Sequence, residues 1–101
     1  MSLRLRNHWN YKGEDWWEWE AFLDDDESGE LHEIDFVRYV LHPTFPDPIR
    51  ISRDRDYNFN LETAGLGEFK LKAFAYKKNG EIKKLEHMIM LAQDPQTGTS
   101  I

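Results

Sequence analysis

The chain contains no cysteine, which excludes disulfides and thiolate zinc sites. It also lacks any apolar run near the roughly 18 residues of a membrane-spanning helix, and it does not begin with a signal-peptide pattern. Its 101 residues, 40% of them hydrophobic and 14% aromatic, suffice for one ordinary core. We therefore expect one soluble cytoplasmic domain that folds without a disulfide, metal or cofactor and does not insert into membranes.

Basic residues are the minority, with 13 lysines and arginines against 19 acidic residues and a net charge of −6. Such a surface repels phosphate backbones and favours cationic partners, so nucleic acid is not expected to bind. Arg50, Arg53 and Arg55 form a small basic patch, but Asp54 and Asp56 interleave with it. We interpret this segment as a solvated, salt-bridged turn rather than a phosphate site.

Helical spacing is also lacking, because apolar residues recur at intervals of two. Strands are predicted over residues 3–6, 17–23, 34–41, 57–61, 69–78 and 81–92, with a hairpin at Asn79-Gly80. The strand 34–41 is apolar on both faces and should be central and best buried. The pattern predicts an all-β, immunoglobulin-like antiparallel β-sandwich of about seven to eight strands over residues 1–92. The polar segment 93–101 is predicted to be a frayed tail.

Proline is scarce, yet three of the four prolines fall between residues 43 and 48. Proline fixes φ and removes a donor, so Thr44 and Phe45 are held by a stiff loop. Further along, Gly65 and Gly67 flank Leu66, which permits positive φ or close backbone approach and predicts a tight bend there. The loops of a sandwich gather at its ends, so these two segments can meet.

Three motifs resemble the YEATS domain, particularly its prokaryotic branch: Trp17-x-Trp19, the run from Tyr39 to Pro48, and the run from Gly65 to Phe69. The resemblance covers residues 3–92. It implies an immunoglobulin fold and a non-enzymatic reader module. Eukaryotic members of the family bind acetylated or crotonylated lysine on histone tails through loops at one end of the sandwich.

An acyl-lysine is a neutral, flat amide, so a reader needs aromatic faces and hydrogen bonds to the amide. The resemblance implies that the first loop supplies an imidazole, a hydroxyl for the amide and an aromatic wall, and that the second supplies a backbone amide and a second wall. The residues expected to bind ligand are His42, Thr44, Phe45, Gly65, Leu66, Gly67 and Trp16.

Leu66 departs from the family pattern, which places tryptophan or tyrosine at this position. Leucine packs against an alkyl chain but has no π face, which lowers affinity by up to about tenfold. A compensating ring would come from Trp9, Tyr11 or Trp16, which adjoin the early loops.

Other chemistries have weaker support. His42 and Asp47 lie close in sequence, but no serine or cysteine nucleophile sits in a recognisable elbow, so no enzyme is expected. The four histidines lack metal-ligand spacing. The acidic run 24–27 is interpreted as a hairpin turn rather than a calcium loop. Trp17 and Trp19 are assigned to the core, whereas Trp16 points the other way.

Three functional hypotheses follow. The leading one is a reader of a peptide, with acylated lysine as the recognised group. The second is a structural or adaptor domain with a degenerate pocket, mediating protein association in a bacterial sensory or effector system. The third is a sugar- or nucleotide-binding sandwich that uses Trp16 and the arginines. The oligomeric state stays open.

Overall fold

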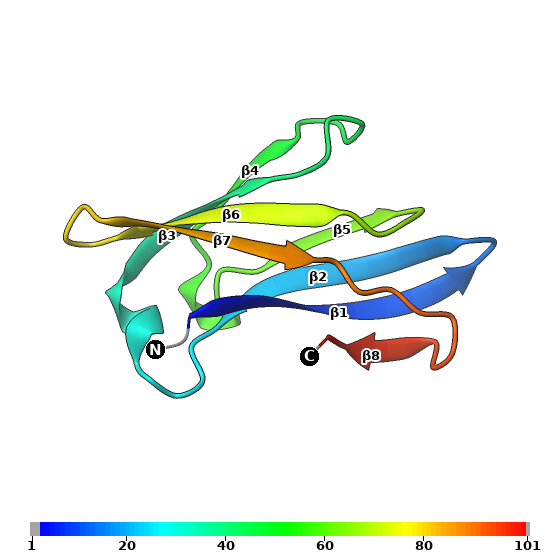
Figure 1. The fold of residues 1–101 in the computed structure, drawn as a ribbon, viewed down its shortest axis with the longest axis horizontal. Coiled ribbons are helices and arrows are strands. Elements are labelled where there is room, and N and C mark those ends of the chain that lie inside the picture. The colour runs from blue at the N-terminus through cyan, green and yellow to red at the C-terminus, as the bar shows by residue number, and fades with distance from the viewer. Residues whose placement is uncertain (1–2, 101) are drawn as a thin grey trace.

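The computed structural model describes residues 3–100 as two packed antiparallel sheets (Figure 1). Sheet A has the strand order β5-β2-β1-β8 and sheet B the order β4-β3-β6-β7. The strands are β1 (Arg4–Gly13), β2 (Trp16–Asp24), β3 (Ile34–Val40), β4 (Ile49–Ser52), β5 (Leu61–Gly65), β6 (Lys70–Lys77), β7 (Ile82–Met88) and β8 (Thr97–Thr99), with short 3-10 turns at Glu30–Glu33 and Arg55–Tyr57. The predicted all-β sandwich is confirmed. Within residues 3–100, no helix is long and apolar enough to cross a membrane.

Alternation along the strands builds the core, as predicted. In β2 every second residue is buried, namely Trp17, Trp19, Ala21 and Leu23. In sheet B the buried residues include Val37, Tyr39, Leu71, Ala73 and Ala75. The β6–β7 hairpin also agrees, because Gly80 has φ 94° and the Lys77 N–H donates to the Glu81 carbonyl at 2.8 Å.

β3 is central, as predicted, because it pairs with both β4 and β6. Its outer face is only partly covered. Phe36 stacks on Tyr76 with ring centroids 4.4 Å apart, and the Arg53 guanidinium lies 4.5 Å from the Phe36 ring centroid. The apolar residues on this second face therefore pack against their neighbours on the sheet surface.

The predicted strand over residues 57–61 is wrong. Residues Arg55–Tyr57 form a 3-10 turn, and Asn58 and Phe59 both have φ 55°, a left-handed conformation incompatible with a strand. Phe59 is buried, and its carbonyl accepts a hydrogen bond from the buried Tyr39 hydroxyl. Phe59 is therefore an apolar residue of the core that lies outside any strand. β5 begins only at Leu61.

β4 was not predicted, because its apolar residues face outward. Ile49 and Ile51 are about half exposed, whereas Ser52 is buried. Among residues 3–100, the predicted salt bridges of the arginine segment are also not seen. Arg53 and Arg55 instead lie over the rings of Phe36 and Phe59, at 4.5 and 5.5 Å from the ring centroids.

The predicted frayed tail over residues 93–101 is wrong for the residues that the structure describes, and Ile101 lies outside them. β8 pairs with β1, and the Trp9 indole N–H donates to the Pro95 carbonyl at 3.1 Å. A Cβ at Gly98 would come within 2.4 Å of the Trp9 ring, so this position requires glycine. The first strand is correspondingly longer than predicted, because it continues past Arg6 to Gly13.

A polar network around Asn7 closes the edge where β1, β7 and β8 meet. Asn7 is fully buried. Its Oδ1 accepts from the Met90 N–H at 2.9 Å and from His87 Nε2 at 2.8 Å, and its Nδ2 donates to the Met90 carbonyl at 2.8 Å. Its backbone N–H donates to Ser100 Oγ at 2.9 Å. Burial, helped by the charge of Arg6, lowers the pKa of His87.

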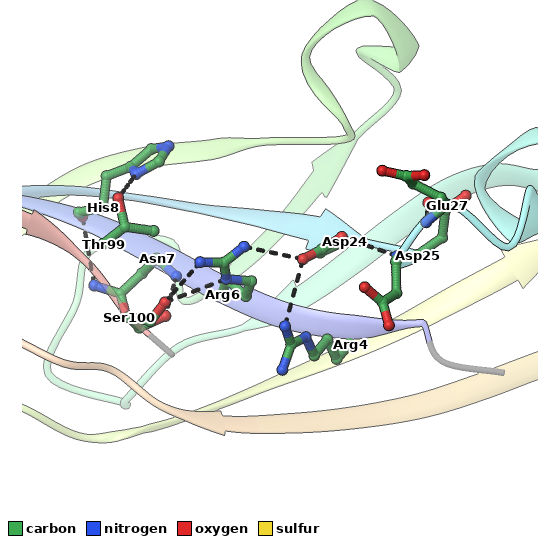
Figure 2. A network of polar contacts seen from close by, with 10 residues as sticks. Arg4, Arg6, Asn7, His8, Asp24, Asp25, Glu27, Thr99 and Ser100 are labelled. Carbon is green, nitrogen blue, oxygen red and sulfur yellow. Dashed lines mark hydrogen bonds and ion pairs between the residues drawn. The ribbon is translucent and has the colours of Figure 1, made fainter.

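The outer part of this network is drawn in Figure 2. The Arg6 guanidinium donates to the Ser100 carbonyl at 2.9 Å and pairs with Asp24 at 3.0 Å, while His8 contacts Thr99. A hydrogen bond from the Asp26 backbone N–H, together with Arg6, lowers the pKa of Asp24. β8 is therefore fixed to the sandwich by side chains as well as by its ladder.

Candidate functional site

The β1–β2, β3–β4 and β5–β6 connections lie at one end of the sandwich, on the right in Figure 1. Between them is a groove of about 450 Å³. It is lined by Trp16, His42, Thr44, Phe45, Pro46, Ala64, Gly65, Leu66, Gly67, Glu68 and Phe69. All seven residues predicted from the sequence are in this set. That they bind a ligand stays a prediction.

The first loop orients a hydroxyl. The Thr44 backbone N–H lies 3.2 Å from His42 Nδ1 and donates to it in the tautomer that leaves this nitrogen unprotonated. Thr44 Oγ1 lies 2.9 Å from the same nitrogen, and in this tautomer its hydroxyl shares Nδ1 as the acceptor. The lone pairs of the exposed hydroxyl are therefore left to accept an N–H from a ligand.

The proline loop is held in place by Arg50. Its Nε donates to the Asp47 carbonyl at 2.6 Å and its Nη2 to the Pro46 carbonyl at 2.8 Å. At the base of the loop, the Leu41 N–H donates to the Pro48 carbonyl at 2.7 Å. Arg50 thus stabilises the loop that carries Thr44 and Phe45. The interpretation of the arginine segment as a solvated turn did not predict this role.

Aromatic rings form the floor of the groove. The centroids of Phe45 and Phe69 are 5.3 Å apart, and the Trp19 ring lies 5.8 Å from Phe69 and 6.5 Å from Phe45, edge to face with the latter. Phe69 was not among the predicted site residues, because the periodicity assigned it to a strand face. Trp19 packs behind these rings and does not itself line the groove.

The second loop forms an exposed wall. Leu66 lies at a bend and is 67% exposed. Neither the positive φ nor the close approach expected of these glycines is seen among residues 3–100. A Cβ at Gly65 would make an ordinary contact, 3.5 Å from Phe45 Cζ, and a Cβ at Gly67 would meet no described atom within 4 Å.

Among the three rings considered as compensation for Leu66, only Trp16 lines the groove. It is 43% exposed. Trp9 is buried against Gly98, and Tyr11 packs on Trp17 with centroids 5.0 Å apart. Trp16 therefore places an exposed aromatic face beside the Leu66 wall.

An acidic hollow of about 540 Å³ adjoins the groove on the outer face of sheet A, and Ala64 lines both. Its carboxylates are Glu18, Glu20 and Glu62. Glu20 and Glu62 are register partners across β2 and β5, so their like charges lie side by side. This surface attracts cationic groups.

The acidic turn after β2 uses its oxygens internally. The Asp25 carboxylate accepts the backbone N–H groups of Glu27, Gly29 and Leu31 at 3.0 to 3.1 Å. Within residues 3–100, no three His, Asp or Glu side chains gather in a way that would hold a metal ion.

The fold and the groove define a class of small β-sandwich domains whose end loops surround one ligand-sized groove. The prokaryotic YEATS domain model matches residues 17–89, and the chain belongs to this family. The resemblance inferred from the three sequence motifs is thus confirmed. No curated protein matches the chain in sequence.

Solved structures of YEATS domains share the fold. The crystal structure of the Yaf9 YEATS domain bound to H3K27ac is 22% identical, with TM-score 0.74 and coverage of 98% of this chain and 79% of that one. The structure of yeast AF-9 homolog protein Yaf9 is 21% identical, with TM-score 0.73 over 97% and 78%. The Yaf9 YEATS domain recognizing H3K122suc peptide is 21% identical, with TM-score 0.65 over 97% and 79%.

Proposed function

We propose that this chain is a non-enzymatic reader module that binds a peptide through the end groove, with an acylated lysine as the recognised group. The observation that carries the proposal is the gathering of the proline loop, the Gly65–Gly67 bend and Trp16 around one open groove. The proposal includes a cytoplasmic setting and assigns no nucleic-acid partner to a chain of net charge −6.

The chemistry of the groove suits a neutral amide. The lone pairs of Thr44 Oγ1 would accept the amide N–H, and the backbone N–H at Leu66 would donate to the acyl carbonyl. Phe45 and Phe69 supply the aromatic floor, and Trp16 supplies a face beside the Leu66 wall. A charged lysine ammonium would lose its hydration over the aromatic floor, and its attraction to Glu68 in the groove lining would offset only part of that cost.

The charge of the surroundings favours a basic peptide. The acidic hollow continues from the groove at Ala64, so lysine or arginine residues flanking the acylated lysine would meet Glu18, Glu20 and Glu62. Two of the similar Yaf9 structures are described as bound to H3K27ac or recognizing H3K122suc peptide. For this chain, the peptide is defined by chemistry rather than by name.

The adaptor hypothesis retains one supporting observation. Ile51, Ile82 and Met88 of sheet B are each at least half exposed, which suits association with another protein. An open channel between Phe45 and Leu66 favours a reader, and a plugged one favours an adaptor. The open groove therefore favours the reader.

The test is calorimetric titration with one lysine-rich peptide in unmodified, acetylated and crotonylated forms. We expect the acylated forms to bind more tightly. Thr44→Ala should weaken their binding several-fold through loss of one hydrogen bond, and Phe45→Ala should weaken it more. Thr97→Ala, an exposed threonine of β8, is the matched control and should change nothing. Absence of millimolar binding, or binding indifferent to both groove substitutions, would refute the proposal.

A further inference from the structure

Four strands form the edges of the two sheets, and three of them are protected against pairing with another chain. β8 is only three residues long, β4 is four residues long and follows Pro48, and β7 carries Lys83 and Lys84. Short strands, proline and lysine are devices with which natural sheets block their edges. β5 has five residues and contains neither proline nor lysine. Its free edge is therefore open to another strand.

The open edge of β5 leads into the groove. β5 pairs with β2 alone, and within residues 3–100 no backbone hydrogen bond from a loop reaches it. Its last two residues, Ala64 and Gly65, line the groove, and the strand ends at the groove end of the sandwich (Figure 1). A peptide whose acylated lysine occupies the groove would thus have its backbone next to unpaired donors and acceptors of β5.

We propose that the peptide binds by strand addition: the residues that follow the acylated lysine pair antiparallel with the free edge of β5 and carry basic side chains at positions +1 and +3. This inference rests on the proposed reader function. In strand addition, main-chain hydrogen bonds provide affinity and alternate side chains provide specificity. The existing β5 pairing is antiparallel, and antiparallel pairs are slightly more stable per residue than parallel ones.

The register of the peptide follows from the faces of β5. Gly65 pairs with the buried Trp17, so it faces the space between the sheets, where a Cβ would lie 3.5 Å from Phe45 Cζ. Residues directly opposite each other in a sheet share a face, so a lysine opposite Gly65 would extend toward Phe45. An antiparallel peptide then runs back along β5, and its position +3 is opposite Glu62.

The charges on the outer face of sheet A select basic side chains at alternate positions. Position +1 is opposite Ala64, which pairs with Glu18 on the acidic outer face. Position +3 emerges on the same face, opposite Glu62, which is exposed and forms no ion pair within residues 3–100. Position +2 is opposite Thr63 and turns toward the core. Opposite charges directly across a strand pair attract, so a lysine should gain affinity at +1 and +3 but not at +2.

Peptides of identical composition test this register by calorimetric titration. Each contains one acetyl-lysine and one unmodified lysine, which is placed at +1, +2 or +3, or at −1, −2 or −3. We expect a lysine at +3 to bind about two- to fivefold more tightly than a lysine at +2. Glu62→Lys should abolish this preference and favour a glutamate at +3. Glu27→Lys makes the same charge change in the exposed turn after β2 and is the matched control, which should leave the preference intact.

The main-chain bonds are tested by methylating one peptide nitrogen at a time from +1 to +4. In an antiparallel pair, alternate residues bond to the partner strand and the others point away from it. Every second N-methyl group should therefore weaken binding several-fold, and those in between should change little. Amide hydrogen exchange adds a readout that needs no variant. At matched occupancy of the groove, the edge-facing amides of β5 should exchange more slowly with the acetylated peptide than with acetyl-lysine alone.

The outcomes separate strand addition from the reader function. Acetylated peptides that bind with no preference between +2 and +3, or with N-methyl effects that do not alternate, would overturn strand addition and leave the proposed function intact. A lysine preference on the N-terminal side of the acetyl-lysine would refute the antiparallel direction. Failure of every acetylated peptide to bind would overturn the proposed function and this inference with it.

Discussion

Two buried polar sites of this small sandwich are built in opposite ways. At the Asn7 network, the side-chain oxygen and nitrogen are bonded to Met90 and His87, and the backbone is bonded to Ser100. Behind the phenylalanine rings that line the groove, Trp19 is also buried, but its indole N–H has no partner within residues 3–100. The Asn7 side chain uses its hydrogen-bonding groups to join parts of the fold, whereas the Trp19 N–H contributes no hydrogen bond to it among those residues.

The two sites also differ in which elements they join. The Asn7 network ties the edges of both sheets and the C-terminal strand together through short bonds. The groove is walled by loops whose side chains are partly exposed. Substitutions should therefore affect stability at the first site and binding at the second.

The largest expected effect is at Asn7. Asn7→Leu keeps the volume but leaves the Met90 backbone groups and His87 without partners, so the free energy of unfolding should fall by about 2–4 kcal/mol. Urea unfolding measures this. Asn10→Leu, on the half-buried outer side of the same strand, should change it by under about 0.5 kcal/mol. Equal effects at the two positions would contradict the comparison.

At the groove, Leu66→Trp should raise the affinity for an acylated peptide by up to about tenfold, because it adds a π face opposite Phe45. Leu66 is mostly exposed, so the unfolding transition should hardly move. Titration calorimetry and thermal unfolding of the same samples separate the two quantities. Weakened binding in a folded Leu66→Trp chain would show that the ligand does not pass along this wall.

Two core tryptophans differ in whether the indole N–H is hydrogen-bonded. Trp17→Phe leaves the Ala92 carbonyl without its donor, whereas Trp19→Phe removes a donor that has no partner. Trp17→Phe should therefore reduce the free energy of unfolding by about 1 kcal/mol more than Trp19→Phe does. Chemical denaturation of both variants decides this, and the reverse order would mean that the Trp19 N–H contributes to the fold.

The smallest expected effect is a pH dependence of stability from His87. Burial and the charge of Arg6 lower the pKa of His87 below its ordinary value of 6.5. Between 6.5 and the lower pKa of the folded state, the unfolded chain binds more protons, so stability should fall as the pH drops below about 6.5. His87→Gln retains a donor for Asn7 and should flatten this part of the profile.

This pH effect is followed by urea midpoints at pH 7.5, 6.5 and 6.0, above the range in which most carboxylates titrate. His32→Gln, at an exposed histidine, is the control and should leave the slope unchanged. If His87→Gln and wild-type chains lose stability in parallel, His87 is not the group responsible.

The strands with regular alternation were predictable from sequence, and those set by distant contacts were not. β2 and β6 show alternating apolar residues, and Asn79-Gly80 has the residues of a tight hairpin turn. β8 does not, because its three residues are fixed by pairing with β1 and by the Trp9 ring over Gly98. β4 was not predicted, because its isoleucines face outward. Phe59 was wrongly assigned to a strand, because the sequence does not distinguish an apolar residue in a left-handed turn from one in a strand.

The part of the candidate site that lies in loops was predictable from the sequence. The prolines and glycines marked both segments, and the sandwich topology brought them to one end. Glu68 and Phe69 were not predicted, because the groove also includes the residues immediately before β6. The unpaired N–H of Trp19 has no sequence signature at all, since Trp17 two residues earlier has the same alternation and a partner.

The groove takes its walls from both layers: Trp16 begins a strand of sheet A, whereas the loop of Thr44 and Phe45 joins two strands of sheet B. A peptide bound there would contact residues that belong to both sheets. Occupancy would then oppose their separation, and amide hydrogen exchange should slow in strands of both sheets, far from the peptide itself.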